Sequence, residues 1–383
     1  MHLGKIVGGV VVAALVLGGI AYAVVWNSPG IQKKLMARVI ASRMGDVDTQ
    51  KLLDDGALHI YLCGTGSPMP DPTRANACTA VIAGGHIVVI DTGPGSWRNI
   101  ARARLPADKI DTILFTHLHS DHIGDLGEFA VQTWIAGRKV PLEIYGPAKL
   151  PSPALAPDSH GHEYGTSGTD DVVEGFALAY DADSGYRIIH HGADYLTPDG
   201  ARMEGHEIPT PKRDQLVPVF DKDGLKISAF LVDHHPVEPA YGFRVEYKGR
   251  LAVISGDTKK TESVERFSQN ADLLVHEALN ADMVNLIVAG LKGSGNQRLS
   301  KMAHDTIDYH TTPVQAAEIA NAAHVKLLVF SHIVPPLPNK LAQHMFLEGV
   351  SAARGKGGTE MGYDGMMITM PGNSDAITTS DLF

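Results

Sequence analysis

Hydrophobic and polar positions divide this chain into two parts. From Leu58 onwards, short runs of β-branched and other apolar residues alternate with stretches whose apolar residues recur at helical spacing. We predict strands at 80–91, 111–117, 226–234, 240–257, 271–278 and 325–332, with hairpin turns at the glycine-containing pairs 84–85 and 248–249. Helices are predicted near 96–104, 124–137, 261–269 and 313–323. This alternation indicates a layered α/β domain.

The N-terminal residues follow a different pattern. Residues 6–26 form an uncharged apolar run, long enough to cross a hydrocarbon core of about 30 Å. The run fits a transmembrane anchor ending at Trp26, or a signal peptide cleaved after Ala21-Tyr22-Ala23. A buried core helix fits less well, because no polar face interrupts the run. We therefore predict an anchor or signal segment at 1–27, a juxtamembrane helix and linker at 28–55, and a catalytic domain at 56–383.

The charges beside this run point to two different locations. The basic residues that follow it favour a cytoplasmic body by the positive-inside rule; they are Lys33, Lys34, Arg38 and Arg43. The Ala-x-Ala sequence favours an exported body, and we predict the periplasmic side. Cys63 and Cys78 are expected to be small buried residues, and an exported body would allow a disulfide between them.

The segment at about 147–205 interrupts the α/β pattern and is predicted to be an inserted lid or arm, with a helix near 169–184. Between 150 and 200 its only basic residue is Arg187. The acidic residues of the same stretch are Asp158, Glu163, Asp170, Asp171, Glu174, Asp181, Asp183, Asp194 and Asp199. This stretch contributes much of the excess of 43 acidic over 33 basic residues in the chain. Because nucleic-acid binders need a basic surface, nucleic acid is not an expected partner.

Histidine is the commonest metal ligand, and the chain has 19 histidines but only 2 cysteines. The two cysteines exclude a four-cysteine zinc module. The densest group is His117-Leu118-His119-Ser120-Asp121-His122, directly after a predicted strand. Alternation at the strand end lets His117 and His119 face one ion, while Asp121 and His122 can face a second from the following turn. Imidazole and carboxylate ligands suit Zn²⁺, Mn²⁺ or iron.

Other predicted strands also end in residues with metal or catalytic chemistry. These ends are Asp91, Thr116-His117, Asp233-His234, Ser255-Gly256-Asp257, His276-Glu277 and Ser331-His332. Active sites of α/β proteins collect at strand ends, so these groups are expected to meet in one crevice.

The HxHxDH motif after a buried strand resembles the metallo-β-lactamase-like superfamily. The run from Val232 to Arg244, the sequence Ser255-Gly256-Asp257-Thr258 and the loop at 62–68 are similar to its ribonuclease Z and arylsulfatase-like branch. The resemblance spans about 58–370. It implies a four-layer αββα sandwich and two divalent ions, with Zn²⁺ expected and Mn²⁺ or iron as alternatives.

The resemblance also implies a set of ligands. One ion would be held by His117, His119 and His234, and the other by Asp121, His122 and His332, with Asp257 between them. His235 is an alternative to His234, which the spacing to Tyr241-Gly242 favours. Two ions about 4 Å apart can share a hydroxide, and Asp121 can orient it.

Three more residues are expected beside the metals. His310 lies in Tyr309-His310-Thr311-Thr312-Pro313. The resemblance implies that a histidine at this place protonates the leaving group. It is the candidate general acid, and its alternative is a cap on the following helix. His276 is expected to orient a ligand, or to be a plain buried hydrogen-bonding residue. Asp91 is expected to be a buried partner of the metal loop.

These observations predict a dinuclear metal-dependent hydrolase acting on a phosphodiester or sulfate ester of a small anionic molecule. The alternatives are a lactonase or β-lactamase, a tRNA 3′-processing endonuclease, and a metal-binding scaffold without activity. Two departures disfavour tRNA processing: the acidic insertion, and Ile254, where ribonuclease Z enzymes are expected to have a glutamate. The membrane and a second copy of the chain, as a homodimer, are further predicted partners.

Overall fold

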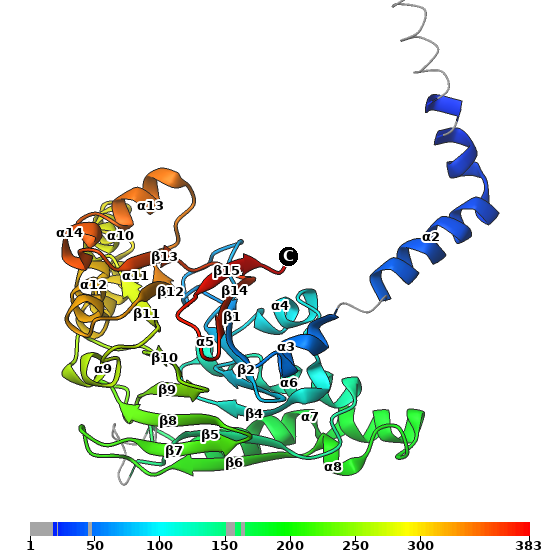
Figure 1. Ribbon diagram of the computed structural model, residues 1–383, viewed down its shortest axis with the longest axis horizontal. Coiled ribbons are helices and arrows are strands. Elements are labelled where there is room, and N and C mark those ends of the chain that lie inside the picture. The colour runs from blue at the N-terminus through cyan, green and yellow to red at the C-terminus, as the bar shows by residue number, and fades with distance from the viewer. Residues whose placement is uncertain (1–17, 21, 45–47, 151–157, 162–164) are drawn as a thin grey trace, which may run out of the picture. The chain divides into compact units, whose positions relative to one another are not determined.

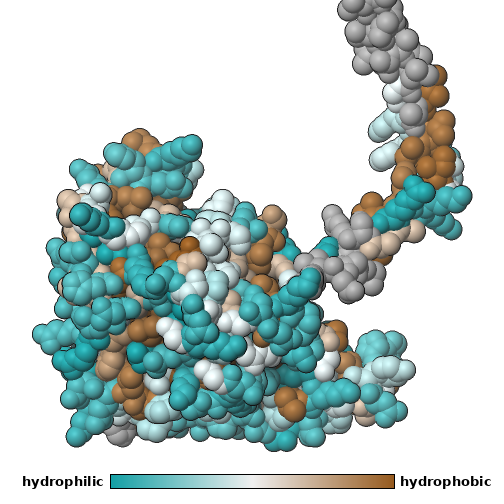
Figure 2. Space-filling view, viewed as in Figure 1, coloured by the Kyte–Doolittle hydropathy of each residue, from teal (hydrophilic) through white to brown (hydrophobic). Residues whose placement is uncertain are grey.

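The computed structural model describes residues 18–20, 22–44, 48–150, 158–161 and 165–383. The chain divides into two compact units at Asp48. In the first unit, helix α2 (Pro29–Met44) lies within the segment 28–55, where a juxtamembrane helix and linker were predicted. Hydrophobic side chains are exposed along the described part of this unit (Figure 2), including Trp26 before α2 and Met36 within it.

Most of the predicted apolar span lies outside the described residues. In the part of the chain that the structure describes, no helix is both long enough and apolar enough to cross a membrane. The anchor, the signal peptide and the segment boundaries at 27 and 55 stay predictions.

The second unit contains two β-sheets (Figure 1). The larger sheet has the strand order β15 (Thr378–Asp381), β14 (Met366–Pro371), β1 (Ala57–Gly64), β2 (Cys78–Ala83), β3 (His86–Ile90), β4 (Ile110–Leu114), β5 (Leu142–Pro147) and β6 (Met203–Ile208). The smaller sheet has the order β13 (Gly358–Met361), β12 (Leu327–Val334), β11 (Leu273–Leu279), β10 (Arg250–Ile254), β9 (Tyr241–Tyr247), β8 (Leu225–Leu231) and β7 (Val217–Lys222).

Helices cover the outer face of each sheet. On the larger sheet, or in its connections, lie α3 (Lys51–Asp54), α4 (Ser96–Arg102), α5 (Ser120–Ile123), α6 (Leu126–Ala136), α7 (Thr169–His191) and α8 (Pro198–Ala201). The connections of the smaller sheet supply α9 (Glu262–Phe267), α10 (Ala281–Gly293), α11 (Gln297–Asp305), α12 (Pro313–Ala322), α13 (Lys340–Phe346) and α14 (Val350–Arg354). Short 3₁₀ turns are η1 (Asp48–Gln50), η2 (Ala107–Lys109) and η3 (Thr306–Tyr309).

Strand alternation builds three apolar layers from these elements. In β1, Leu58, Ile60 and Leu62 point into the core between the two sheets. The alternate residues Tyr61 and Cys63 point outward and pack beneath α4 and α6. A third cluster packs α12 and its neighbours against the smaller sheet. Two sheets with helices outside them form the predicted αββα sandwich, which is confirmed.

The predicted insertion contains the expected helix, which is longer than predicted and forms α7. The chain returns to the sheet at β6, which pairs in parallel with β5. The sequence analysis did not predict β6, because Met203–Ile208 is mostly polar and shows no clear alternation.

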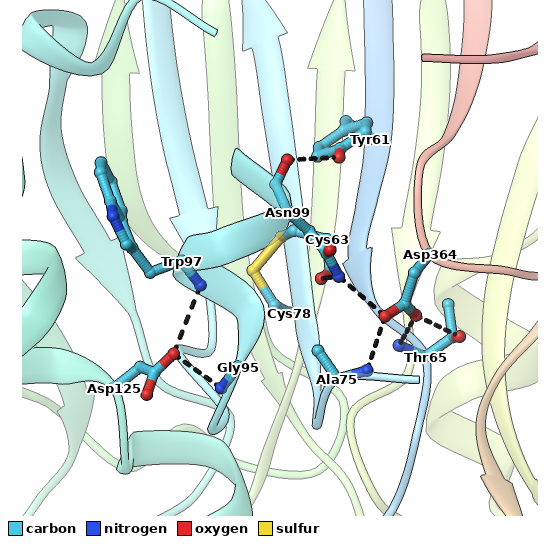
Figure 3. Close-up of a disulfide and its surroundings, with 10 residues drawn as sticks. All are labelled: Tyr61, Cys63, Thr65, Ala75, Cys78, Gly95, Trp97, Asn99, Asp125 and Asp364. Carbon is cyan, nitrogen blue, oxygen red and sulfur yellow. Dashed lines mark hydrogen bonds between the residues drawn. A yellow bond between two sulfur atoms is a disulfide. The ribbon is translucent and has the colours of Figure 1, made fainter. Parts of the chain in front are cut away.

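Cys63 and Cys78 form a disulfide between the adjacent antiparallel strands β1 and β2, with 5.0 Å between their Cα atoms (Figure 3). Both side chains are buried, as expected, and the structure contains the disulfide that the sequence analysis left open. The reason is the register of the two strands, which places Cys78 opposite Gly64, beside Cys63.

Candidate metal centre

The predicted metal-ligating residues meet where strands of the two sheets end. His117 and His119 follow β4, and Asp121 and His122 belong to the short helix α5. The smaller sheet contributes His234 from the β8–β9 connection, Asp257 from the segment after β10, and His332 from β12. All of these side chains are buried except that of His119, which is partly exposed.

Asp257 lies at the middle of this cluster. Its Oδ2 is 3.3 Å from Nε2 of His332 and 3.4 Å from Nε2 of His122. The same oxygen is 3.9 Å from Nε2 of both His117 and His234. One carboxylate oxygen that faces four imidazole nitrogens occupies the position expected of a ligand shared by two ions.

Two groups of ligand atoms surround that carboxylate. His117, His119 and His234 form one group and Asp121, His122 and His332 the other, with ligand atoms within 4.8 Å of one another in each group. These are the two predicted triads. His235 does not join them, because its side chain is exposed and lies 3.2 Å from Glu238.

Hydrogen bonds behind the ligands fix which imidazole nitrogen faces the centre. Nδ1 of His234 donates to the Tyr309 carbonyl at 3.0 Å, and Nδ1 of His122 donates to the Asp91 carboxylate at 2.8 Å. Carbonyl and carboxylate oxygens only accept, so in the neutral imidazoles the proton lies on Nδ1 and Nε2 carries the lone pair. Within the part of the chain that the structure describes, both Nε2 atoms are buried without a hydrogen-bond partner, which fits ligands to a metal ion.

Asp91 is placed as expected and holds the metal loop from behind. Its Oδ1 accepts the Thr116 backbone N–H, and its Oδ2 accepts the Thr116 hydroxyl, each at 2.8 Å. The role of Tyr309 was missed, because a backbone carbonyl leaves no signal in the side-chain pattern.

Burial and neighbouring charges set the protonation states of the ligands. Burial alone would raise the pKa of Asp121, but His122 and His332 lower it to about 2. Burial also opposes ionisation of Asp257, yet His332 and His122 hold the pKa of Asp257 well below its usual range. Burial lowers the pKa of His234 to about 4. At neutral pH these groups are two carboxylates and a neutral imidazole, which are the forms that bind metal ions.

His122 shows the opposite trend. Burial lowers its pKa, but the carboxylates of Asp257, Asp91 and Asp121 outweigh burial and raise the pKa of His122 well above its ordinary value. Three carboxylates around one buried imidazole leave an excess of negative charge. Divalent cations would balance that charge, so the donor set fits the predicted pair of ions.

Two local backbone features aim the ligands. Gly256 has φ +60°, and a Cβ there would lie 2.5 Å from the Tyr241 carbonyl oxygen, so glycine lets the chain turn before Asp257. In β12 the pairing register shifts after Ser331, and His332 adopts φ +42°. This bulge turns the His332 ring towards the centre.

His310 lies beside the ligands, and its partner is Glu277. Nδ1 of His310 is 3.2 Å from Oε1 of Glu277. Burial lowers the pKa of His310, but Glu277 outweighs burial and raises it. Glu277 comes from β11, the parallel neighbour of β10, on which Ile254 occupies the position where a glutamate was expected. The neighbouring strand therefore supplies the carboxylate: the sequence analysis named Glu277 among the strand ends but did not pair it with His310.

His276 does not reach the ligands. Leu274 and His276 are two residues apart on β11 and therefore lie on the same face of the strand, and Leu274 packs against the helix layer. Glu277 lies on the opposite face, towards the centre. Nδ1 of His276 donates to the Glu277 carbonyl at 2.7 Å instead. Of the two readings of His276, the geometry fits a buried hydrogen-bonding residue, because neighbouring strand residues point to opposite faces.

A cleft of about 240 Å³ opens onto the ligands. Its walls combine His119, Asp121 and His310 with the apolar side chains of Met69 and Val334. An ester held there would have His310 on one side and ligand residues on the other.

Comparison with known proteins identifies the family of the chain. Residues 72–308 match the family described as Metallo-beta-lactamase superfamily. Ribonuclease Z of Mycobacterium avium (strain 104) is 36% identical over 280 residues, which cover 73% of this chain and 87% of that protein. Ribonuclease Z of Mycobacterium bovis (strain BCG / Pasteur 1173P2) is 37% identical over 283 residues, with the same coverage of 73% and 87%.

Two solved structures share the fold. The metallo-beta-lactamase fold protein YhfI from Bacillus subtilis has a TM-score of 0.55 at 19% identity, over 82% of this chain and 99% of that one. The short form of human tRNase Z has a TM-score of 0.50 at 22% identity, also over 82% and 99%.

Proposed function

The chain belongs to the metallo-beta-lactamase superfamily, as a metal-dependent hydrolase related to ribonuclease Z, and we propose that it hydrolyses small phosphodiesters. The observation that carries the proposal is His310 beside the ligand cluster, with Glu277 behind it at 3.2 Å. A phosphodiester with an alkoxide leaving group needs a proton on its departing oxygen, and a buried histidine with a raised pKa can donate one. Sulfate esters present the same demand and are the second substrate class.

The ions, Asp121, His310 and Glu277 have different roles in this proposal. When bound, two divalent ions, Zn²⁺ in our proposal, would supply Lewis-acid activation of water and of the ester. Asp121, with its pKa lowered to about 2, is ionised and can accept a hydrogen bond from the attacking water. His310 donates a proton to the leaving oxygen, and Glu277 orients the His310 ring.

The names of the relatives and the charge pattern of this chain point to different substrates. The relatives are named ribonuclease Z, which weighs against the expectation that nucleic acid is not a partner. The acidic helix α7 weighs against long RNA, because each phosphate would meet carboxylates. A short anionic ester is consistent with both observations.

The test is a rate panel on the full chain with added Zn²⁺ or Mn²⁺. The substrates are bis(p-nitrophenyl) phosphate, an aryl sulfate, a homoserine lactone, a cephalosporin and precursor tRNA. We expect the phosphodiester to be cleaved fastest. Faster cleavage of the lactone or the cephalosporin would replace the proposal with hydrolysis at a carbonyl, and no turnover of any substrate would favour the scaffold alternative.

We also propose that the catalytic domain works in an oxidising compartment, on the exported side of the membrane. The disulfide between Cys63 and Cys78 supports this, because structural disulfides persist in such compartments. A reporter fused to the C-terminus and thiol titration of protein taken directly from cells test the proposal. Two free thiols and a cytoplasmic reporter signal would overturn it. The homodimer stays a prediction.

A further inference from the structure

A second cavity, of about 680 Å³, adjoins the metal cleft. The two share the lip formed by Ser67, Pro68 and Met69. The metal cleft alone has a volume of about 240 Å³. Ligand sites usually have about 300–1,000 Å³, so the cleft is small for one. A substrate of nucleotide size that reacts at the metal centre would therefore extend over this lip into the second cavity.

The carboxylates around the second cavity are occupied by donors of the protein itself. Asp364 accepts hydrogen bonds from the backbone N–H groups of Thr65 and Ala75 at 3.0 and 2.6 Å, and from Asn99 Nδ2 at 2.8 Å (Figure 3). Asp71 accepts from the N–H and the hydroxyl of Thr73 at 2.8 and 2.6 Å. These donors hold both carboxylates in place and partly offset their negative charge.

The same figure shows the equivalent arrangement for the nearby Asp125. Its Oδ2 accepts from the backbone N–H groups of Gly95 and Trp97 at 2.8 and 3.3 Å (Figure 3). Asp125 is therefore engaged at the start of α4, the helix that carries the arginines of this cavity.

The arginines, in contrast, keep free donors. Arg98 and Arg102 lie four residues apart on α4, so their side chains share one face of that helix, and both are exposed. Among the described residues, no carboxylate lies within 4.0 Å of Arg98, although Arg98 partly offsets the rise that burial causes in the pKa of Asp125. Arg102 stacks on the Phe383 ring at 3.6 Å, a contact that leaves the N–H groups at the edge of the guanidinium available.

We infer that this arginine cavity, defined by Arg98 and Arg102 beside the lip at 67–69, binds a phosphate group of the substrate other than the one cleaved. The inference rests on the proposed phosphodiester activity. It makes the preferred substrate a nucleotide-like diester with an additional phosphate. Guanidinium groups suit phosphate because their donors match its oxygen atoms in paired geometry.

Another cavity provides a matched control. It has about 700 Å³, shares no lining residue with the metal cleft, and also contains two exposed arginines, Arg213 and Arg266, and Lys260, which pairs with Glu318. Its lining includes the carboxylates of Asp233, Glu238 and Glu262, of which Glu262 has no hydrogen-bond or ion-pair partner among the described residues. A phosphate is therefore expected to prefer the arginine cavity.

The experiment compares two substrates that differ by one phosphate. Thymidine 5′-(p-nitrophenyl phosphate) and its 3′-phosphorylated form release the same leaving group. For the metal-loaded wild type, we expect kcat/KM to favour the 3′-phosphorylated form by about tenfold, mainly through KM. In Arg98→Ala this preference falls close to one, whereas Arg213→Ala retains it. Added salt weakens the preference, because the arginines are exposed.

A wild type without preference, or an Arg98→Ala variant that keeps it, would overturn the inference. If neither substrate is cleaved, the proposed activity fails, and the cavity is tested by binding instead. Calorimetry then measures the Kd of thymidine 3′,5′-bisphosphate. A weaker Kd in Arg98→Ala but not in Arg213→Ala supports the phosphate site, and equal values in all three proteins contradict it.

Discussion

The metal centre and helix α7 differ in how the rest of the protein constrains them. At the metal centre, ligands from separate segments are buried and held by hydrogen bonds from behind, as Asp91 holds His122 at 2.8 Å. Helix α7 buries only Thr169 and Val173. Its apolar side chains Leu178 and Ile189 are 77% and 84% exposed.

The difference separates two questions about function. The buried centre has little freedom to vary, so it determines the class of reaction. Helix α7 packs against β6 and α6 along one side, but its acidic residues Glu174 and Asp181 are exposed, so their charges can determine which substrates approach. A ribonuclease Z-like centre in a domain that also carries an acidic helix fits the same chemistry applied to small esters.

The largest effect is expected at the centre, from Asp257→Ala. Its Oδ2 lies 3.3–3.9 Å from four imidazoles, so its loss removes the shared ligand. We expect activity to fall by about 10³-fold, because the ions that Asp257 would hold stabilise the charge that develops on the ester. Metal analysis should show fewer than two ions per chain. Asp282→Ala, an exposed substitution on α10, is the control, and an Asp257→Ala variant with full metal content and activity would contradict the assignment.

His310→Ala should have the next largest effect, and the effect should depend on the leaving group. Without a proton donor, alkyl phosphodiesters should be cleaved about 10²–10⁴-fold more slowly. The loss should be much smaller for p-nitrophenyl esters, whose leaving group needs no proton. His304→Ala, at an exposed position of α11, is the matched control. Equal losses on both kinds of ester would show that His310 is not the acid.

Replacing both cysteines tests how much the disulfide between β1 and β2 contributes to stability. The bridge closes a loop of sequence separation 15, and Cys63→Ser/Cys78→Ser should lower the free energy of unfolding by about 3 kcal/mol. Denaturant titration of the wild type and the variant measures this. Unchanged stability would mean that strand pairing between β1 and β2 alone holds this region.

The smallest effect is expected on α7, from Glu174→Lys/Asp181→Lys at two exposed positions. Binding of precursor tRNA should strengthen by about tenfold at low salt, and the slope of log K against log salt should steepen by about two. Asp282→Lys/Glu348→Lys adds the same charge elsewhere on the surface. If both pairs strengthen binding equally, net charge alone governs RNA binding and α7 has no special part in it.

Much of this protein could be predicted from short stretches of its sequence. Alternation and turn residues within a few positions indicate strands, helices and the αββα layers, and the spacing of His117, His119 and His122 indicates ligands on one strand end. These signals are local, because neighbouring residues of one strand or turn keep a fixed geometry wherever the segment lies.

Contacts between distant segments were decided only by the tertiary structure. Parallel pairing of β10 with β11 lets Glu277 partner His310, although Ile254 occupies the expected position. Strand register pairs Cys63 with Cys78, and strand parity turns His276 away from the ligands. Such contacts depend on how whole strands align across the sheet. No local sequence pattern encodes that alignment, because it results from the packing of many side chains at once.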